Sequence, residues 1–255
     1  MSDEIKYDIF EGMTSISAVI KSIADGSSNR TIIKILYDKN HSKSKYKELK
    51  FLEYRSREFG FELLPVDASE IDALTSGTTH GGIVAVCTQR TYPDLNVNFL
   101  TNANFCVLID GIEDPYNFGY SVRSLYAAGT DCIVLPPRNW LELSGTVARS
   151  SAGTTEIANI YVSDPVEAIN TFKSCGFEIV CAGIRDSHSL YEYEFSKPVL
   201  LVIGGEKRGI SRKLLDLSDT TIRIDYGRDF MGSLPSASAV SVIAFEIARK
   251  KRLLH

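Results

Sequence analysis

Apolar residues recur along the chain at two spacings that alternate. Short uninterrupted apolar runs are typical of buried strands, and apolar positions three and four residues apart indicate amphipathic helices. Their alternation predicts an α/β fold. The predicted strands are 31–37, 61–66, 83–88, 105–109, 132–135, 157–162, 178–182, 199–203 and 221–224, and the predicted helices are 13–24, 45–59, 69–74, 118–128, 164–174, 211–216 and 235–253.

The periodic pattern is lost between residues 90 and 104, where Pro93 and several asparagines stand. Loss of periodicity around a proline is typical of a linker between domains. The sequence therefore predicts a small α/β domain over residues 1–92 and a larger domain over residues 103–255 with a mostly parallel sheet. In the first domain we expect Gly60 to end helix 45–59 and Ser69 to cap the next helix.

Composition acts mainly by excluding classes of protein. The 255 residues are 44% hydrophobic, as in soluble globular chains. The acidic start of the chain and the lack of an apolar run of about 18 residues argue against a signal peptide and a membrane span, so we expect a cytoplasmic protein. The five cysteines and four histidines lack metal-site spacing, so we expect buried thiols and no metal.

Charge is distributed unevenly along the chain. The net charge is −4, yet residues 30–57 carry nine basic and three acidic side chains. A basic segment in an acidic protein indicates a phosphate-binding face, with Arg30, Lys43 and Lys47 as candidate RNA contacts. A solvated helix surface remains the alternative. His80, in a turn rich in glycine and threonine, is expected to be a structural residue or an edge contact to RNA.

The stretch 105–129 predicts a strand, a polar turn and a helix. The apolar run ends at residue 109, and apolar residues recur at helical spacing after the turn. Asn117 and Arg123 therefore follow the carboxyl end of a predicted strand, where open α/β sheets bind ligands. Taken alone, the two are also compatible with a turn asparagine and a helix-surface arginine.

A second polar segment, 203–210, runs from a strand into a glycine-rich turn with Glu206 at its tip. A nucleotide-binding P-loop is excluded, because Ile210 and Ser211 follow Gly209 where a lysine and a serine or threonine are needed. The turn instead allows the backbone to approach a ligand closely.

A third segment, 222–238, leads from a strand through a glycine-containing loop into a serine-rich helix start. Ser233 or Ser236 can cap this helix. The loop again follows a predicted strand.

Together the three segments resemble the SpoU (TrmH-type) family of RNA ribose 2′-O-methyltransferases, in the SPOUT superfamily. The resemblance extends from about residue 102 to the end of the chain, and the first 90 residues resemble the ribosomal-protein-like substrate-binding domain of many members. The third motif matches only in part, since Asp225 and Tyr226 replace Pro-Met and Pro235 replaces asparagine. The matching positions are Asn117, Gly119 and Arg123 after Asp114-Pro115, the connector 149–153, then Gly204, Glu206, Gly209 and Ile210, and finally Ile224, Ser233 and Leu234.

The resemblance implies a SPOUT domain with a deep trefoil knot that binds S-adenosylmethionine. It also implies a homodimer with a shared active site, to which the apolar face of the last helix is expected to contribute. The resemblance assigns catalytic roles to Asn117, Arg123, Glu206 and Ser233. It assigns cofactor binding to Ala182, Gly183, Gly204, Ile224 and Leu234.

The implied reaction is methylation of a ribose 2′-hydroxyl in rRNA or tRNA. A guanidinium with a pKa above about 12 is a poor proton acceptor. We therefore expect Arg123 to anchor the adjoining phosphate or to stabilise developing alkoxide charge. We expect Asn117 and Glu206 to hold the geometry of the site, and Asn117 and Arg123 to face the methyl group.

The alternative is an RNA-binding protein that has the fold without catalysis. Pro235 motivates it, because proline removes both a backbone donor and the amide side chain at that position. The sequence leaves open the target RNA and nucleotide, the general base and any role in antibiotic resistance.

Overall fold

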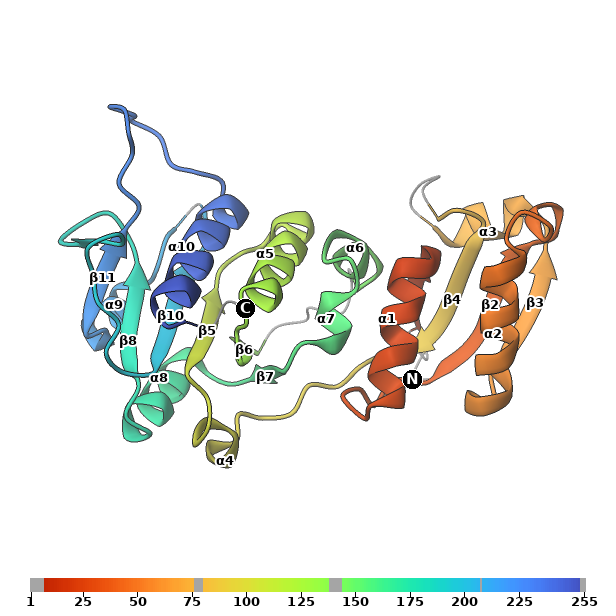
Figure 1. The fold of residues 1–255 in the computed structure, drawn as a ribbon, viewed down its shortest axis with the longest axis horizontal. Coiled ribbons are helices and arrows are strands. Elements are labelled where there is room, and N and C mark those ends of the chain that lie inside the picture. The colour runs from red at the N-terminus through yellow and green to blue at the C-terminus, as the bar shows by residue number, and fades with distance from the viewer. Residues whose placement is uncertain (1–6, 76–79, 138–143, 207, 253–255) are drawn as a thin grey trace, which may run out of the picture. The chain divides into compact units, whose positions relative to one another are not determined.

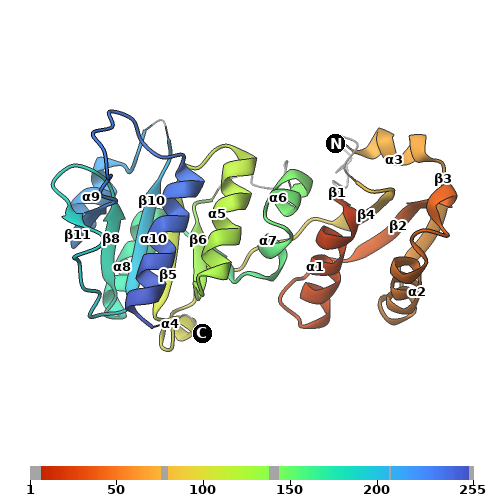
Figure 2. The ribbon, with the colours of Figure 1, turned by 45° about the horizontal axis from the view of Figure 1, so that its top comes forward.

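The computed structural model describes residues 7–75, 80–137, 144–206 and 208–252 (Figures 1 and 2). The chain forms two compact units. The first unit comprises Met1–Thr91 and Asn139–Ile157, and the second comprises Tyr92–Arg138 and Ala158–His255. The change at residues 91–92 lies at the predicted linker, but the return of residues 139–157 to the first unit was not predicted.

The first unit contains a mixed four-stranded sheet in the order β1-β4-β2-β3. β2 and β3 are parallel because helix α2 connects them as a crossover, whereas β4 is antiparallel to β1 and β2. The edge strand β1 was not predicted. The bounds are β1 Tyr7–Glu11, α1 Gly12–Ala24, β2 Ile32–Asp38, a 3₁₀ turn Lys39–His41, α2 Tyr46–Phe59, β3 Glu62–Val66, α3 Ala68–Leu74 and β4 Ile83–Thr88.

Two helix ends in the first unit test the predicted caps. Gly60 ends α2 in the left-handed conformation at φ 76°, as its sequence predicts. The prediction for Ser69 is wrong, because the cap of α3 is Asp67. Asp67 forms a capping box with Glu70. An aspartate directly before the helix precluded a cap at the second helical position.

Residues 144–157 form two short helices, α6 (Ser144–Ser150) and α7 (Thr154–Ile157), that pack on β1 and α1 of the first unit. The approach is close, since a Cβ at Gly145 would stand 2.3 Å from the Ile9 carbonyl oxygen. Arg149 forms an ion pair of 2.8 Å with Glu11. The connector predicted to belong to the larger domain thus completes the smaller one.

Arg30 is a buried residue of the first unit and not a surface contact. Its guanidinium donates hydrogen bonds to Asp8 and to Glu156, at 3.0 Å to Glu156 Oε2, and all three residues are 2% exposed. Burial disfavours the charged guanidinium, but Glu156 and Asp8 outweigh it, so the pKa of Arg30 is raised. The prediction that Arg30 contacts RNA is therefore wrong.

The second unit contains a parallel seven-stranded sheet in the order β7-β6-β5-β10-β8-β11-β9. Helices α5 and α10 lie side by side on one face, and α8 and α9 lie on the other (Figures 1 and 2). The bounds are α4 Val97–Leu100, β5 Phe105–Asp110, α5 Pro115–Ala127, β6 Cys132–Leu135, β7 Ile160–Val162, α8 Pro165–Ser174, β8 Glu178–Ala182, β9 His188–Ser189, β10 Val199–Gly204, α9 Arg212–Leu217, β11 Thr220–Arg223 and α10 Ser236–Lys250.

The apolar face of α10 is buried inside its own unit. Its members are at most 3% exposed. The expectation that this face contributes to a dimer is therefore wrong, because the sheet and α5 already cover it. The members are Val240, Ile243, Ala244, Ile247 and Ala248. Leu253, at the end of the predicted helix, lies outside the described residues.

The cysteines agree with a further expectation. All five cysteines are free thiols, and four of them are buried. No helix in the described ranges is both long enough and apolar enough to cross a membrane.

Candidate active site

The carboxyl ends of β5 and β10 lie side by side, with Asp110 opposite Gly204 in the parallel register. The backbones that follow approach so closely that no side chain fits between them. A Cβ at Gly205 would stand 2.1 Å from the Gly111 carbonyl oxygen, and one at Gly204 would stand 2.3 Å from the Gly209 carbonyl carbon. Gly204 of the second motif and its neighbour Gly205 are therefore required by this packing.

A cavity of about 740 Å³ opens beside these loops. The structure brings all five predicted cofactor-binding residues to its wall. The wall is formed mainly by the segments that follow β8, β10 and β11 and by the start of α10, with apolar side chains and exposed backbone. The five residues are Ala182, Gly183, Gly204, Ile224 and Leu234.

Glu206 connects the three motifs at the rim of this cavity. Its Oε1 accepts hydrogen bonds from Asn117 Nδ2 at 2.9 Å, from Ser236 Oγ at 2.9 Å and from Ser236 N at 3.2 Å. Asn117 is placed by the first turn of α5, where Asp114 accepts its backbone N–H at 2.8 Å. Ser236 begins α10, so the helix dipole also favours the carboxylate.

Ser236 was missed as a site residue, and Ser233 is not part of this network. Ser233 is exposed at the cavity wall and forms no hydrogen bond with a described residue. Ser236 is only 9% exposed, and neither serine caps the helix, because Pro235 occupies the cap position. The signal for Ser236 was its place directly after a proline at a helix start, where its N–H is free to bind an acceptor.

Arg123 lies apart from the other predicted catalytic residues. Six positions separate it from Asn117 along α5, which rotates it by about 240° around the helix axis. It is exposed and forms no hydrogen bond or ion pair with a described residue. No contact joins Arg123 to Asn117 or Glu206 among the described residues, so the expectation that Asn117 and Arg123 face one methyl group stays a prediction.

The residues that depart from the third motif form their own contacts. The Tyr226 hydroxyl accepts a hydrogen bond from the Leu234 N–H at 3.2 Å, which closes the loop between β11 and α10. Asp225 accepts hydrogen bonds from Ser189 and from Arg223 Nε, the latter at 2.8 Å. The Ser189 hydroxyl and then Arg223 lower the pKa of Asp225, so the loop is anchored through a carboxylate.

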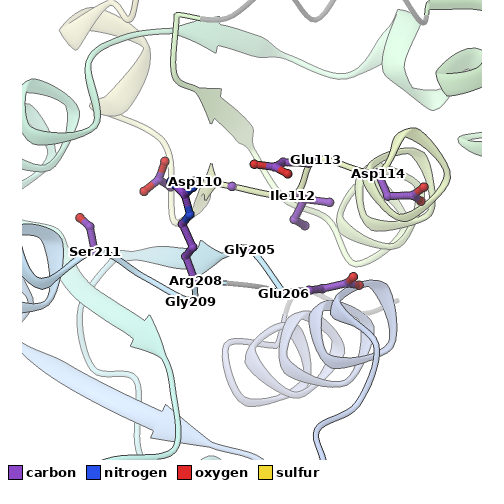
Figure 3. A pocket seen from close by; sticks show the side chains of 10 residues that line it. Asp110, Ile112, Glu113, Asp114, Gly205, Glu206, Arg208, Gly209 and Ser211 are labelled. Atoms are coloured by element: carbon purple, nitrogen blue, oxygen red, sulfur yellow. The ribbon is translucent and has the colours of Figure 1, made fainter.

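A second cavity of about 490 Å³ lies on the other side of the Glu206 turn. Asp110, Glu113 and Arg208 line it, together with Asp114 and Ser211. Figure 3 shows the Glu206 side chain pointing away from Asp110 and Glu113. Gly205, Glu206 and Gly209 thus form a wall shared by two cavities, and Glu206 is directed to the partners that the first motif and α10 supply.

The predicted RNA contacts of the first unit divide into exposed and enclosed side chains. Lys43 and Lys47 are exposed near and on α2. His80 is buried, with Nδ1 accepting the Gly82 N–H at 3.0 Å and Nε2 3.0 Å from Asp72 Oδ1. Both ring nitrogens are occupied, so the structural alternative for His80 is the supported one. Residues 76–79 of its turn lie outside the described residues.

The chain is similar to known proteins along nearly its whole length. Residues 9–93 match the domain family described as "RNA 2′-O ribose methyltransferase substrate binding". A putative TrmH family tRNA/rRNA methyltransferase of Staphylococcus saprophyticus is 29% identical over 243 residues, which cover 93% of this chain and 94% of the relative. A relative of the same description from Staphylococcus aureus is 29% identical over 193 residues, covering 73% of this chain and 77% of the relative.

Solved structures share the fold. An AdoMet-bound rRNA methyltransferase from Sinorhizobium meliloti superimposes with a TM-score of 0.79 at 22% identity, over 99% of this chain and 90% of that one. The SpoU methyltransferase AviRb from Streptomyces viridochromogenes, in complex with AdoMet, has a TM-score of 0.77 at 21% identity, over 96% and 91%. Residues 104–245, more than half of the sequence, match the family model itself, and the chain therefore belongs to the SpoU rRNA methylase family.

Proposed function

We propose that this chain methylates the 2′-hydroxyl of a ribose in rRNA or tRNA, with S-adenosylmethionine as the methyl donor. The observation that carries the proposal is the Glu206 network, which joins three family motifs at the rim of the 740 Å³ cavity. The cavity is large enough for a nucleoside-sized ligand, and its mixture of apolar side chains and backbone groups suits one.

The residues present fit the cofactor. Ala182, Gly183, Gly204, Ile224 and Leu234 would hold it, because the glycines leave backbone groups accessible and the aliphatic side chains can cover an adenine ring. When bound, it supplies a methyl group on a positively charged sulfur.

Glu206 is proposed to position the acceptor hydroxyl. Its Oε1 is held by Asn117 and Ser236, while Oε2 forms no hydrogen bond with a described residue. Oε2 is thus free to accept a hydrogen bond from the 2′-hydroxyl as it attacks. Holding the reacting atoms in line provides much of the rate gain in such displacements. Ser233 at the cavity wall is proposed to contact the RNA.

Arg123 is proposed to act in a homodimer, on the site of the second copy. It lies on one exposed stripe of α5 with Tyr116 and Tyr120, which are spaced four and three residues apart along the helix. Phe245 is exposed on the neighbouring α10. An isologous interface over this stripe would bring Arg123 to the partner's substrate, where it would bind a phosphate or stabilise alkoxide charge.

We also propose the deep trefoil knot and the cytoplasmic location that the sequence predicts. The return of α10 to pack on α5 supports the knot, because the chain must come back from β11 across the loops after β8 and β10. Free buried thiols are the usual state of cysteines in a reducing compartment.

The inactive RNA-binding alternative loses its main support. It rested on Pro235, which supplies neither an N–H nor an amide side chain. Ser236, the next residue, donates both its N–H and its hydroxyl to Glu206. The carboxylate therefore keeps two donors from the start of α10 despite the proline.

Mapping ribose methylation in total RNA from cells with and without the gene tests the proposal. We expect one site to be lost, to be restored by the wild type and by Arg212→Ala, and not to be restored by Arg123→Ala. Arg212 is a matched control because it is exposed and paired only with Asp216 on its own helix among the described residues. An unchanged methylation map, or no calorimetric binding of S-adenosylmethionine, would contradict the proposal.

A further inference from the structure

The outward face of α2 carries aromatic rings where a surface helix normally carries only polar residues. Tyr46 is 61% exposed, Tyr54 is 65% exposed and Phe51 is 37% exposed. Leu49 and Leu52 form the buried side of the helix, so the rings point to the opposite side. Much of the ring surface of the two tyrosines is left in solvent, and three exposed rings on one helix face form an apolar patch of the kind that binds a partner.

A cation lies over each of these rings. Lys50 Nζ lies 5.7 Å from the Tyr46 ring centre, and the Arg55 guanidinium lies 5.5 Å from Phe51 and 5.6 Å from Tyr54. Contacts at these distances orient a ring through cation–π attraction. Eight residues separate the two tyrosines, which places them about 12 Å apart along the helix on one side.

The cations of this surface fall into paired and free groups. Lys45, Lys50 and Arg55 are neutralised by Glu48, Glu53 and Glu58, each three residues further on. Three more cations are exposed and form no ion pair with a described residue, so they are available to an anion. These are Lys43, Lys47 and Arg57.

We propose that this surface, Tyr46, Phe51 and Tyr54 with Lys43, Lys47 and Arg57, binds unpaired RNA nucleotides by base stacking. Exposed rings stack on free base faces, which every unpaired nucleotide presents and a duplex does not. The free cations bind the phosphates between the bases. A protein partner is disfavoured because lysine is depleted from protein interfaces.

The proposal deepens the proposed function and rests on it, since the RNA is the methylation substrate. It specifies that the first unit recognises a loop or bulge and not a regular helix. Arg30 and His80 take no part, because both are enclosed by the first unit.

Fluorescence anisotropy with the full chain tests the surface. The probes are a labelled single-stranded RNA without secondary structure and a duplex of the same sequence, each titrated at several salt concentrations. The variants are Tyr46→Leu with Tyr54→Leu, and Lys43→Gln with Lys47→Gln. Tyr7→Leu is the control, because Tyr7 is an exposed tyrosine on β1 of the same unit.

We expect the double tyrosine variant to lose roughly 10-fold or more in single-strand affinity, with an unchanged slope of affinity against salt. Its duplex binding should stay within about twofold. The double lysine variant should instead lower that slope by roughly 1.4, since each phosphate contact contributes about 0.7 for a single strand. The control should bind like the wild type.

Two results would overturn the proposal. One is equal weakening of single-strand and duplex binding in the tyrosine variant. The other is unchanged RNA binding with loss of binding to an intact ribosomal subunit, which would identify a protein contact. Loss of methyl transfer in a chain whose RNA binding still depends on the tyrosines would refute only the proposed function.

Discussion

Arg30 in the first unit and Glu206 in the second are both charged side chains that gather partners from distant parts of the sequence. Arg30 binds Asp8 and Glu156, and Glu206 binds Asn117 and Ser236. Arg30 and its partners are buried, whereas Glu206 is exposed at the rim of a cavity. The Arg30 cluster is closed to solvent, whereas the Glu206 cluster is open to the cavity on one side.

This difference separates a structural charge from one available for chemistry. A buried charge whose partners are removed costs several kcal/mol, because no water replaces them. An exposed carboxylate with one oxygen held and the other free can bind a ligand with little rearrangement. Substitution of Arg30 should therefore mainly reduce stability, and substitution of Glu206 should mainly reduce activity.

Arg30→Met should give the largest effect on stability. It leaves Asp8 and Glu156 buried without their cation, and we expect the free energy of unfolding to fall by about 3–5 kcal/mol. Urea unfolding measures the change. Lys47→Met, at an exposed cation without a partner among the described residues, should change it by less than about 0.5 kcal/mol. Equal effects of the two substitutions would refute the structural role of Arg30.

Glu206→Gln should show the opposite pattern. We expect methyl transfer to fall by about 100-fold or more, because the amide cannot accept as a carboxylate does, while the free energy of unfolding changes by less than about 1 kcal/mol. Single-turnover methylation and urea unfolding measure the two quantities. Glu192→Gln, at an exposed glutamate, is the control. If Glu206 had only a structural role, Glu206→Gln would lower the free energy of unfolding together with the methylation rate.

Ser236→Ala should have an intermediate effect on activity. It removes the Oγ donor at 2.9 Å from Glu206 and leaves the backbone donor, so we expect about a 10-fold loss in kcat with little change in KM for RNA. Ser236→Thr retains the hydroxyl and should restore most of the rate. Ser238→Ala, exposed on the same helix, is the control. Failure of the threonine variant to recover activity would argue that packing at Ser236 matters and not its hydroxyl.

The smallest expected effect concerns the hydrogen bond between Tyr193 and Glu178 in the second unit. Burial, and then the hydrogen bond to Glu178, raise the pKa of Tyr193 from 10.0 to about 12. A raised folded-state pKa means that the unfolded chain ionises first, so the free energy of unfolding should fall as pH rises from 10 toward about 12. Urea unfolding across this range should show a weaker decline for Tyr193→Phe than for the wild type, and Tyr126→Phe, at an exposed tyrosine, should leave it unchanged.

Local patterns identified most helices and strands. They also identified the site segments around Asn117, Glu206 and Leu234, but not Ser236. Helix α2 begins one residue from its predicted start and ends at Gly60, and the segments around Asn117, Glu206 and Leu234 were placed after strands as observed. Periodicity and turn chemistry act over a few residues, so they can be read from the sequence. Ser236 escaped notice because a helix-cap serine and a serine that binds a remote carboxylate have the same local context.

The alternation of apolar runs and amphipathic segments was enough to predict two α/β domains with a linker over residues 90–104, and the polar segments after the strands predicted an active site there. It did not predict that residues 139–157 join the first unit or that Arg30 is buried against Glu156. These depend on which partners meet across more than a hundred residues of sequence. Contacts of that range form only when the chain packs, because burial and charge pairing are properties of the assembled surfaces and not of any local pattern.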